Sequence, residues 1–387
     1  MTRARPPAGF LLAVLVILLS GVGCGSSDEG PDVQFPSSPK AFADESYAEL
    51  ATDGKRDLWM AVAGYNRNRE FGLRVFRMQE SGWTALPSPS GRVSPDVPIS
   101  IAVAGGGARS TPCLGYSTDP SRLPIVSCWS DGHWSSKAMP RQQSAQLLQI
   151  SGDSGGLIAL LLDQPTSRLA KYRVLRFHSG LWTPEGPPVS ATSAVARLAV
   201  DLAPDPDSPA IGVTTQSTRA ERYVLGLRGK RWQRVGPVIR GLGVGPMVGG
   251  PVLTSSSVLF PVTEADVVPW TFSTHSMRVG SSKVKSSSKR LSDGAGNAQG
   301  RLDVAGGEIW ATWQEDKPLR DGRFRVGIFA AELKADGSAR RQFELWRGVS
   351  IGPGSTQVVD FQGQRIALYM PSSSDGRGLQ ATVRRLP

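Results

Sequence analysis

The segment "PIVSCWSDGHWSSKAMP" (residues 124–140) contains an apolar stretch, a polar turn with glycine, a tryptophan and, a few residues later, a proline. Three other segments follow the same order: "LRVFRMQESGWTALPSP" (73–89), "RVLRFHSGLWTPEGPP" (173–188) and "YVLGLRGKRWQRVGP" (223–237). Their tryptophans, Trp83, Trp134, Trp182 and Trp232, lie 51, 48 and 50 residues apart. So even a spacing indicates a chain built from repeats of this length.

Each repeat also has two short apolar stretches before this segment, for example "AQLLQIS" and "LIALLLD" before Trp182. No long stretch has helical periodicity, so each repeat is expected to form four short strands. Four-stranded sheets repeated around an axis are the blades of a β-propeller. We therefore predict an all-β fold, a seven-bladed β-propeller, with six or eight blades as the alternatives.

The propeller is expected to cover residues 32–387 as a single domain. The last blade has only three strands of its own, and "DVQFPSSP" (32–39) is similar to the fourth-strand segment "WTALPSPS". We expect an N-terminal strand to complete the last blade, because a closed ring has no exposed sheet edges. The expected blades cover residues 45–92, 96–141, 144–190, 194–240, 243–292, 297–347 and, for the last, 355–387 together with 32–39.

The N-terminus has two arginines, an uncharged run from Pro6 to Gly23, and Cys24. This pattern is typical of a secretory signal. The string "GVGC" resembles the lipobox of bacterial lipoproteins, which implies a signal peptide over residues 1–23 and lipidation of Cys24. Lipidation would anchor the exported chain to the cell membrane or the outer membrane, facing the periplasm or outward; an uncleaved or differently cleaved signal is the alternative. Residues 24–31, rich in Gly and Ser, are expected to form a flexible tether.

Apart from Cys24, the chain contains only Cys113 and Cys128, which are expected on the second and third strands of the second blade. They lie at equal distances from the middle of the connecting loop, and such positions are adjacent in an antiparallel pair. Because export leads to an oxidising compartment, we predict a structural disulfide between them. The three histidines fall on separate blades, and neither a metal nor a cofactor is expected.

The segment "SGDSGG" (151–156) contains the string that surrounds the nucleophilic serine of chymotrypsin-like proteases. That chemistry needs a histidine base and an aspartate in a two-barrel fold. Only His133 precedes Ser154, 21 residues upstream, and the repeat pattern puts residues 152–156 in the turn between the first two strands of a blade. We therefore interpret Ser154 as a turn residue.

The formal net charge of the chain is +11, and +9 remains when Arg3 and Arg5 leave with the signal. This charge favours an anionic partner, although an ordinary soluble basic surface explains it equally well. Nucleic acid is not an expected partner, because the chain is expected to be exported and has no nucleic-acid-binding motif.

Six of the seven loops expected between second and third strands contain arginine, and these loops share one face of a propeller. Arginine binds carboxylates, sulfates and phosphates with two parallel hydrogen bonds, so this face is a candidate anion-binding surface. Ordinary charged loops, with acidic residues interspersed, are the alternative. The arginines are Arg67, Arg69, Arg122, Arg168, Arg219, Arg222, Arg320, Arg323 and Arg377.

The hairpins "QESGW" and "SDGHW" resemble degenerate Asp-box repeats of sialidase-like propellers, with Asp131, Gly132 and Trp134 as the matching residues. In that family the box stabilises the hairpin between the third and fourth strands and has no catalytic role. The resemblance covers the repeat pattern of about four blades. The "Arg-Ile-Pro" segment of sialidases is absent and no arginine triad can be assigned, so sialidase activity is not expected.

Asp303 and Asp360 each lie three residues before a turn glycine in neighbouring blades, so both are expected near the central channel. Paired carboxylates can serve as acid and base in glycan hydrolysis, whereas binding of water and backbone amides is the structural alternative. We expect a non-catalytic module that binds an envelope protein or an anionic polysaccharide. A glycan-active hydrolase or lyase that uses these two aspartates is the alternative function.

Overall fold

The computed structural model describes residues 35–387 except 80–81, 96–98, 106–109, 122, 138, 141–144, 154–155, 164–169, 192–197, 202–209, 216–220, 241–250, 255–256, 265–270, 279–286, 294–296, 351–353 and 373–377. In these residues every regular element is a strand, and no helix is long and apolar enough to cross a membrane. The signal peptide, Cys24 and the tether lie outside the described residues, as does Ser154, between the end of one strand and the start of the next.

The strands form seven small antiparallel sheets. Sheets one to three contain β1 (Asp44–Thr52), β2 (Leu58–Tyr65), β3 (Phe71–Gln79) and β4 (Gly82–Leu86); β5 (Ser100–Ala104), β6 (Thr111–Ser117), β7 (Pro124–Ser130) and β8 (His133–Lys137); and β9 (Gln146–Asp153), β10 (Gly156–Asp163), β11 (Ala170–His178), β12 (Leu181–Pro184) and β13 (Val189–Ala191). Sheets four and five contain β14 (Leu198–Asp201), β15 (Ala210–Thr215), β16 (Glu221–Arg228) and β17 (Arg231–Arg240); and β18 (Val252–Leu253), β19 (Ser257–Glu264), β20 (Thr271–Arg278) and β21 (Ser287–Arg290). Sheets six and seven contain β22 (Asn297–Ala305), β23 (Glu308–Pro318), β24 (Phe324–Leu333) and β25 (Ala339–Ser350); and β26 (Thr356–Phe361), β27 (Gln364–Tyr369) and β28 (Thr382–Arg385).

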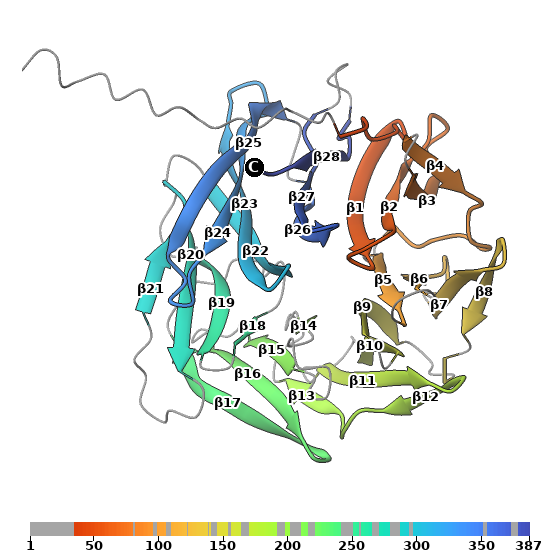
Figure 1. Ribbon diagram of the computed structural model, residues 1–387, viewed down its shortest axis with the longest axis horizontal. Coiled ribbons are helices and arrows are strands. Elements are labelled where there is room, and N and C mark those ends of the chain that lie inside the picture. The colour runs from red at the N-terminus through yellow and green to blue at the C-terminus, as the bar shows by residue number, and fades with distance from the viewer. Residues whose placement is uncertain are drawn as a thin grey trace, which may run out of the picture. The chain divides into compact units, whose positions relative to one another are not determined.

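These sheets are the blades of a seven-bladed β-propeller (Figure 1), so the predicted fold is confirmed. The first strand of each blade lies nearest the axis (Figure 1). Because neighbouring strands are antiparallel, the connections alternate between the two ends of the blade. We call the end with the β1–β2 and β3–β4 turns and their equivalents the hairpin face. The opposite end, with the β2–β3 loop and its equivalents, is the loop face.

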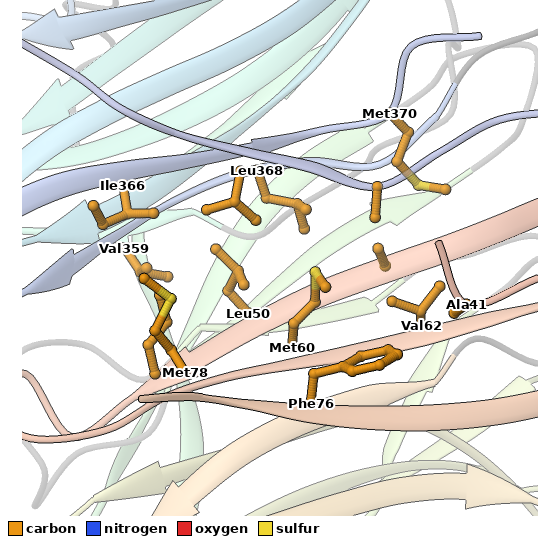
Figure 2. Packing of buried hydrophobic residues seen from close by; sticks show 14 of the residues in the cluster. Ala41, Leu50, Met60, Val62, Phe76, Met78, Val359, Ile366, Leu368 and Met370 are labelled. Carbon is orange, nitrogen blue, oxygen red and sulfur yellow. The ribbon is translucent and has the colours of Figure 1, made fainter. Parts of the chain in front are cut away.

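The hydrophobic core consists of clusters between adjacent blades. Figure 2 shows the cluster that joins blade seven to blade one, in which Leu50 and Met60 lie close to Ile366 and Leu368. Burial of such apolar surface is the main stabilising term, at about 25 cal/mol per Å². Every cluster lies between residues 35 and 386, which form one compact unit, so a chain that begins at residue 25 keeps the whole core.

Indole groups at the outer rim join successive blades. The Nε1–H of Trp83 donates to the carbonyl of Pro36 at 3.2 Å. Equivalent hydrogen bonds run from Trp134 to Pro87 at 2.6 Å and from Trp232 to Pro187 at 2.9 Å. In blades one, two and four, the recurring tryptophan and the proline of the preceding blade are therefore two halves of one contact.

The segment after residue 35 occupies the outer edge of the last blade. Its Pro36 carbonyl accepts the rim hydrogen bond of blade one, and its Ser38 Oγ accepts a hydrogen bond from the Val383 N–H of β28 at 3.0 Å. Residues 35–39 nevertheless form no strand, since Pro36 and Pro39 have no N–H to donate to a ladder. Residues 32–34 of the expected strand lie outside the described part of the chain.

Two buried features fasten the ends and the second blade. The Glu45 carboxylate accepts hydrogen bonds from the backbone N–H groups of Ala41 and Ala381, so it ties the start of the ring to its end. Cys113 and Cys128 are register partners on β6 and β7 and form a disulfide. The predicted disulfide is confirmed.

Candidate anion-binding face

Two of the predicted arginines lie in the short β2–β3 loop. The Asn66 side chain shapes this loop, because its Oδ1 accepts the backbone N–H groups of Asn68 at 2.8 Å and Glu70 at 3.0 Å. Arg69 has a φ of 61°, in the left-handed region, and its N–H donates to the Asn66 carbonyl. The loop thus holds Arg67 and Arg69 at the loop face, where both are exposed and make no ion pair with a described residue.

The β23–β24 loop places two more arginines on the same face, in blade six. Arg323 binds Asp321 through its Nε at 2.8 Å and its Nη2 at 2.6 Å, and this partner lowers the pKa of the Asp321 carboxyl. The charge of Arg323 is therefore locally neutralised. Arg320 is exposed, and within the described part of the chain it has no acidic partner.

Of the remaining five arginines of the predicted face, one lies in a strand and four lie outside the described residues. Arg222 is the second residue of β16, where it pairs with Ile239 in the ladder, so it belongs to a strand and not to the loop before it. The other four lie outside the described residues; they are Arg122, Arg168, Arg219 and Arg377.

Asp303 joins blades six and seven. One carboxylate oxygen pairs with Arg301 at 2.8 Å, and the other accepts the backbone N–H of Val358 in β26 at 2.9 Å. The residue is 8% exposed, and burial raises the pKa of its carboxyl. Both oxygens thus have structural partners.

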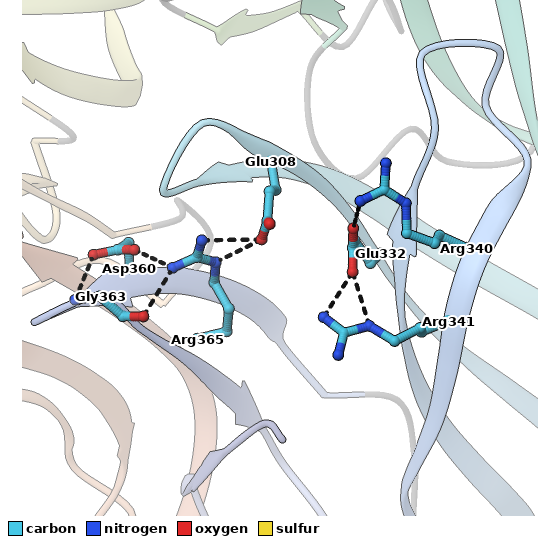
Figure 3. A network of polar contacts seen from close by, with 7 residues as sticks. All are labelled: Glu308, Glu332, Arg340, Arg341, Asp360, Gly363 and Arg365. Carbon is cyan, nitrogen blue, oxygen red and sulfur yellow. Dashed lines mark hydrogen bonds and ion pairs between the residues drawn. The ribbon is translucent and has the colours of Figure 1, made fainter.

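Asp360 is bound to a different arginine. Figure 3 shows Arg365 between Asp360 and Glu308, with an Arg365 Nη2–Glu308 Oε2 distance of 2.9 Å. The Asp360 carboxylate also accepts the backbone N–H of Gly363 at 3.3 Å. The two aspartates lie on adjacent inner strands, as expected from the sequence, but each is held in its own ion pair.

A third carboxyl near the axis was not singled out from the sequence. Glu49 of β1 accepts the backbone N–H of Ile101 in blade two at 2.9 Å. Burial raises the pKa of Glu49 to about 7, because the nearby Arg301 only partly offsets it and the Asp303 charge adds to it. The Arg301 guanidinium lies near two buried carboxyls, those of Glu49 and Asp303. It pairs directly with Asp303, so Glu49 keeps its proton to near neutral pH.

A carboxyl pair at the loop face of blade six was also missed. Glu315 Oε1 accepts the indole N–H of Trp313 at 2.9 Å and the backbone N–H of Asp293 at 3.2 Å. Burial and the adjacent Asp293 carboxyl raise the pKa of Glu315 to about 7. The two residues are 22 positions apart, on a strand and on an inter-blade connection, and no sequence pattern links them. Among the described residues no group of three or more His, Cys, Asp or Glu side chains could hold a metal ion.

No family model matches the sequence, and no curated protein matches it. The structure is similar to a puromycin-hydrolysing peptidase of Mycobacterium tuberculosis, with a TM-score of 0.54 and 11% identity. The match covers 92% of this chain and 54% of the peptidase, so the chain spans about half of that protein. The β-propeller domain of the Trilobed protease from Pyrococcus furiosus, which has an open velcro topology, gives a TM-score of 0.50 at 8% identity, covering 88% of this chain and 95% of that domain.

Sialidase-like propellers are also among the matches. A neuraminidase-like protein of A/flat-faced bat/Peru has a TM-score of 0.46 and 9% identity over 76% of this chain and 89% of its own. Fucose lectins match with TM-scores of 0.46 to 0.48. Likeness at such low identity establishes the fold alone, which is that of a β-propeller.

Proposed function

We propose that the protein is an exported β-propeller, anchored by a lipid on Cys24, that binds an anionic partner at its loop face without catalysing a reaction. The observation that carries the proposal is the exposure of Arg67, Arg69 and Arg320 on this face, none of them paired with an acidic residue of the described chain. Exposed guanidinium groups without partners are available to carboxylates, sulfates or phosphates of a glycan or an envelope protein.

The position of these arginines supports one extended partner. Arg67 and Arg69 belong to blade one and Arg320 to blade six, with only blade seven between them. A partner with several anionic groups can therefore contact both loops. Such multivalent binding gains affinity without any single strong contact.

The alternative, a glycan-active hydrolase or lyase, has less support. An acid and a base need a proton that can leave and lone pairs that can face a substrate. Asp303 and Asp360 instead use their oxygens on Arg301, Arg365 and backbone N–H groups. These contacts are typical of carboxylates with a structural role.

The first test is binding of soluble residues 25–387 to arrays of acidic and neutral glycans at low and high salt. The triple variant Arg67→Gln, Arg69→Gln, Arg320→Gln is expected to bind acidic glycans on the order of 10- to 100-fold more weakly, since each lost ionic contact contributes roughly 1 kcal/mol. The matched control, Arg228→Gln, Lys230→Gln, Arg231→Gln, removes the same charge from the hairpin face and should retain glycan binding. Equal losses in the two variants would mean that binding depends on net charge alone, which contradicts the proposal.

The anchor has its own test. In the full chain, Cys24→Ser removes the thiol to which a lipid would be attached, so the protein should move from the membrane fraction to the soluble fraction and lose incorporation of labelled fatty acid. A Cys24→Ser chain that still carries labelled lipid would contradict a lipid on this residue.

A further inference from the structure

The hairpin face carries an unneutralised basic tip in blade four. We call Arg228, Lys230 and Arg231, at the turn between β16 and β17, the basic hairpin. The backbone pairs Arg228 with Arg231, and Gly229 has a φ of 62° in the two-residue turn. All three cationic side chains are exposed, and none has an ion pair or hydrogen bond with another described residue.

Several other described cations on this face are balanced by acids. Figure 3 shows Arg340 and Arg341 of blade six on either side of the buried Glu332, at 2.7 Å from its oxygens. Lys55 and Arg56 lie in a turn whose ends are Asp53 and Asp57. The basic hairpin differs because three positive charges stand together with no acidic residue between Arg228 and Arg231.

An apolar side chain is exposed on the hairpin of the neighbouring blade. Leu181 begins β12, directly after the turn that follows β11, and is 70% exposed, more than any other large hydrophobic residue described. Blades three and four are in contact here, because Pro187, shortly after β12, accepts the rim hydrogen bond of Trp232. Cations and an exposed leucine on one face are typical of surfaces that lie against a lipid bilayer, whereas a soluble polyanion would make no favourable contact with the leucine.

The chain also enters the propeller at the hairpin face. Pro36 lies beside the β3–β4 hairpin, where its carbonyl binds Trp83, and the segment then crosses to the loop face, where the Ala43 N–H donates to the Tyr65 carbonyl. The described part of the chain therefore begins at the hairpin face. Even fully extended, the residues from Cys24 to Gln34 span at most about 40 Å.

We propose that the hairpin face lies against an anionic phospholipid bilayer, with the basic hairpin on the phosphate-bearing headgroups. This inference rests on the proposed lipid anchor at Cys24. Blade four lies across the ring from blades one and seven, where the chain enters (Figure 1). Pro36 and the basic hairpin lie on opposite sides of one face (Figure 1). An anchor at Cys24 together with the basic hairpin would keep the ring flat on the membrane and present the loop face with Arg67, Arg69 and Arg320 to its partner.

The test uses residues 25–387, which carry no lipid and retain the whole core. Sedimentation with vesicles of phosphatidylcholine alone is compared with sedimentation with equal amounts of phosphatidylcholine and phosphatidylglycerol. We expect binding to the anionic vesicles only, falling with salt. Because each cation near an anionic surface contributes about fivefold in affinity, the variant Arg228→Gln, Lys230→Gln, Arg231→Gln should bind on the order of 100-fold more weakly. Leu181→Ser should weaken binding by a smaller factor.

The matched control is Arg67→Gln, Arg69→Gln, Arg320→Gln, which removes the same charge from the loop face and should leave vesicle binding unchanged. Circular dichroism establishes that each variant is folded. The inference is overturned if both triple variants lose vesicle binding equally, if neutral vesicles bind as well, or if the wild type binds soluble dextran sulfate through the basic hairpin but no vesicle. Glycan binding without vesicle binding overturns this inference and leaves the proposed function standing. Vesicle binding without glycan binding supports this inference and contradicts glycan binding at the loop face.

Discussion

Adjacent blades are joined in two different ways, at the rim and near the axis. At the rim the joint is neutral and repeated, an indole N–H of Trp83, Trp134 or Trp232 on a proline carbonyl of the preceding blade. Near the axis the joints differ from one another, and two of them are made by carboxyl groups. Asp303 reaches from blade six to Val358 of blade seven, and Glu49 reaches from blade one to Ile101 of blade two.

The difference shows which part of a propeller a repeat specifies. At the rim three blades meet the preceding blade through the same hydrogen bond, so one pair of residue types suffices for several joints. Near the axis the first strands converge, and one guanidinium, Arg301, influences carboxyls from blades one and six. Buried charges are costly unless paired, so these joints depend on particular combinations of residues.

The largest effect is expected at the axis, from Asp303→Ala. This change leaves Arg301 in a site with 18% side-chain exposure without its carboxylate, and removes the acceptor of the Val358 N–H. Breaking a buried pair by removing one partner costs about 3 to 5 kcal/mol. Urea unfolding followed by tryptophan fluorescence measures the loss.

Asp303→Asn is the matched control, since an amide oxygen can still accept from Val358 while the charge is gone. The free energy of unfolding lost in Asp303→Asn should be smaller than that lost in Asp303→Ala, but greater than zero. A loss below about 1 kcal/mol for Asp303→Ala would be the size expected of a surface ion pair and would contradict a structural role for this aspartate.

The fold was predictable because its signals recur. The tryptophans of four repeats set the blade length, and the length of the chain then favoured seven blades over six or eight. The disulfide was predictable because antiparallel symmetry pairs Cys113 with Cys128. The strand expected over residues 35–39 does not form. The repeat identifies the position of the segment, but the two prolines prevent it from joining the ladder.

The candidate site was less predictable, because loops do not share the register of the strands. The sequence placed Arg67, Arg69 and Arg320 in exposed loops, but not the local pairing of Arg323 with Asp321. Asp303 and Asp360 lie on neighbouring inner strands, as predicted, but their separate arginine partners were not predicted. The buried settings of Glu49 and Glu315 were not foreseen, since each depends on a contact with a different blade or with an inter-blade connection.

A smaller effect is expected in the pH dependence of the free energy of unfolding. The carboxyl groups near the axis should contribute to this dependence, whereas the neutral contacts at the rim should not. Unfolded, Glu49 releases its proton near its ordinary pKa of 4.5; folded, it keeps the proton to about 7. Between these values the folded state binds more protons, so the free energy of unfolding falls as pH rises. The contribution is fully present below about pH 4.5 and lost above pH 7, and amounts to at most about 3 kcal/mol.

Glu49→Gln removes this titration and keeps an oxygen for the Ile101 N–H. The variant should gain on the wild type as pH rises from acid to mildly alkaline conditions, measured as thermal or urea unfolding at each pH. Arg301 and Asp303 still face the site, so a residual dependence remains. Glu315→Gln tests the second carboxyl with a pKa of about 7, and its effect should add to that of Glu49→Gln, because the two respond to different neighbours. A Glu49→Gln variant with the wild-type pH profile would contradict the assignment.

The smallest effect is expected at the rim, where one hydrogen bond is replaced without changing shape. β-(3-Benzothienyl)alanine has sulfur in place of the indole N–H, and at position 134 it removes the donor to the Pro87 carbonyl. A loss of about 1 kcal/mol in the free energy of unfolding is expected. Trp182 is the internal control, because its buried Nε1–H has no hydrogen-bond partner in the described part of the chain. The same replacement there should be neutral or stabilising. Equal losses at the two positions would mean that the rim joint rests on packing of the ring, and that the recurring proline contributes its shape and not its carbonyl.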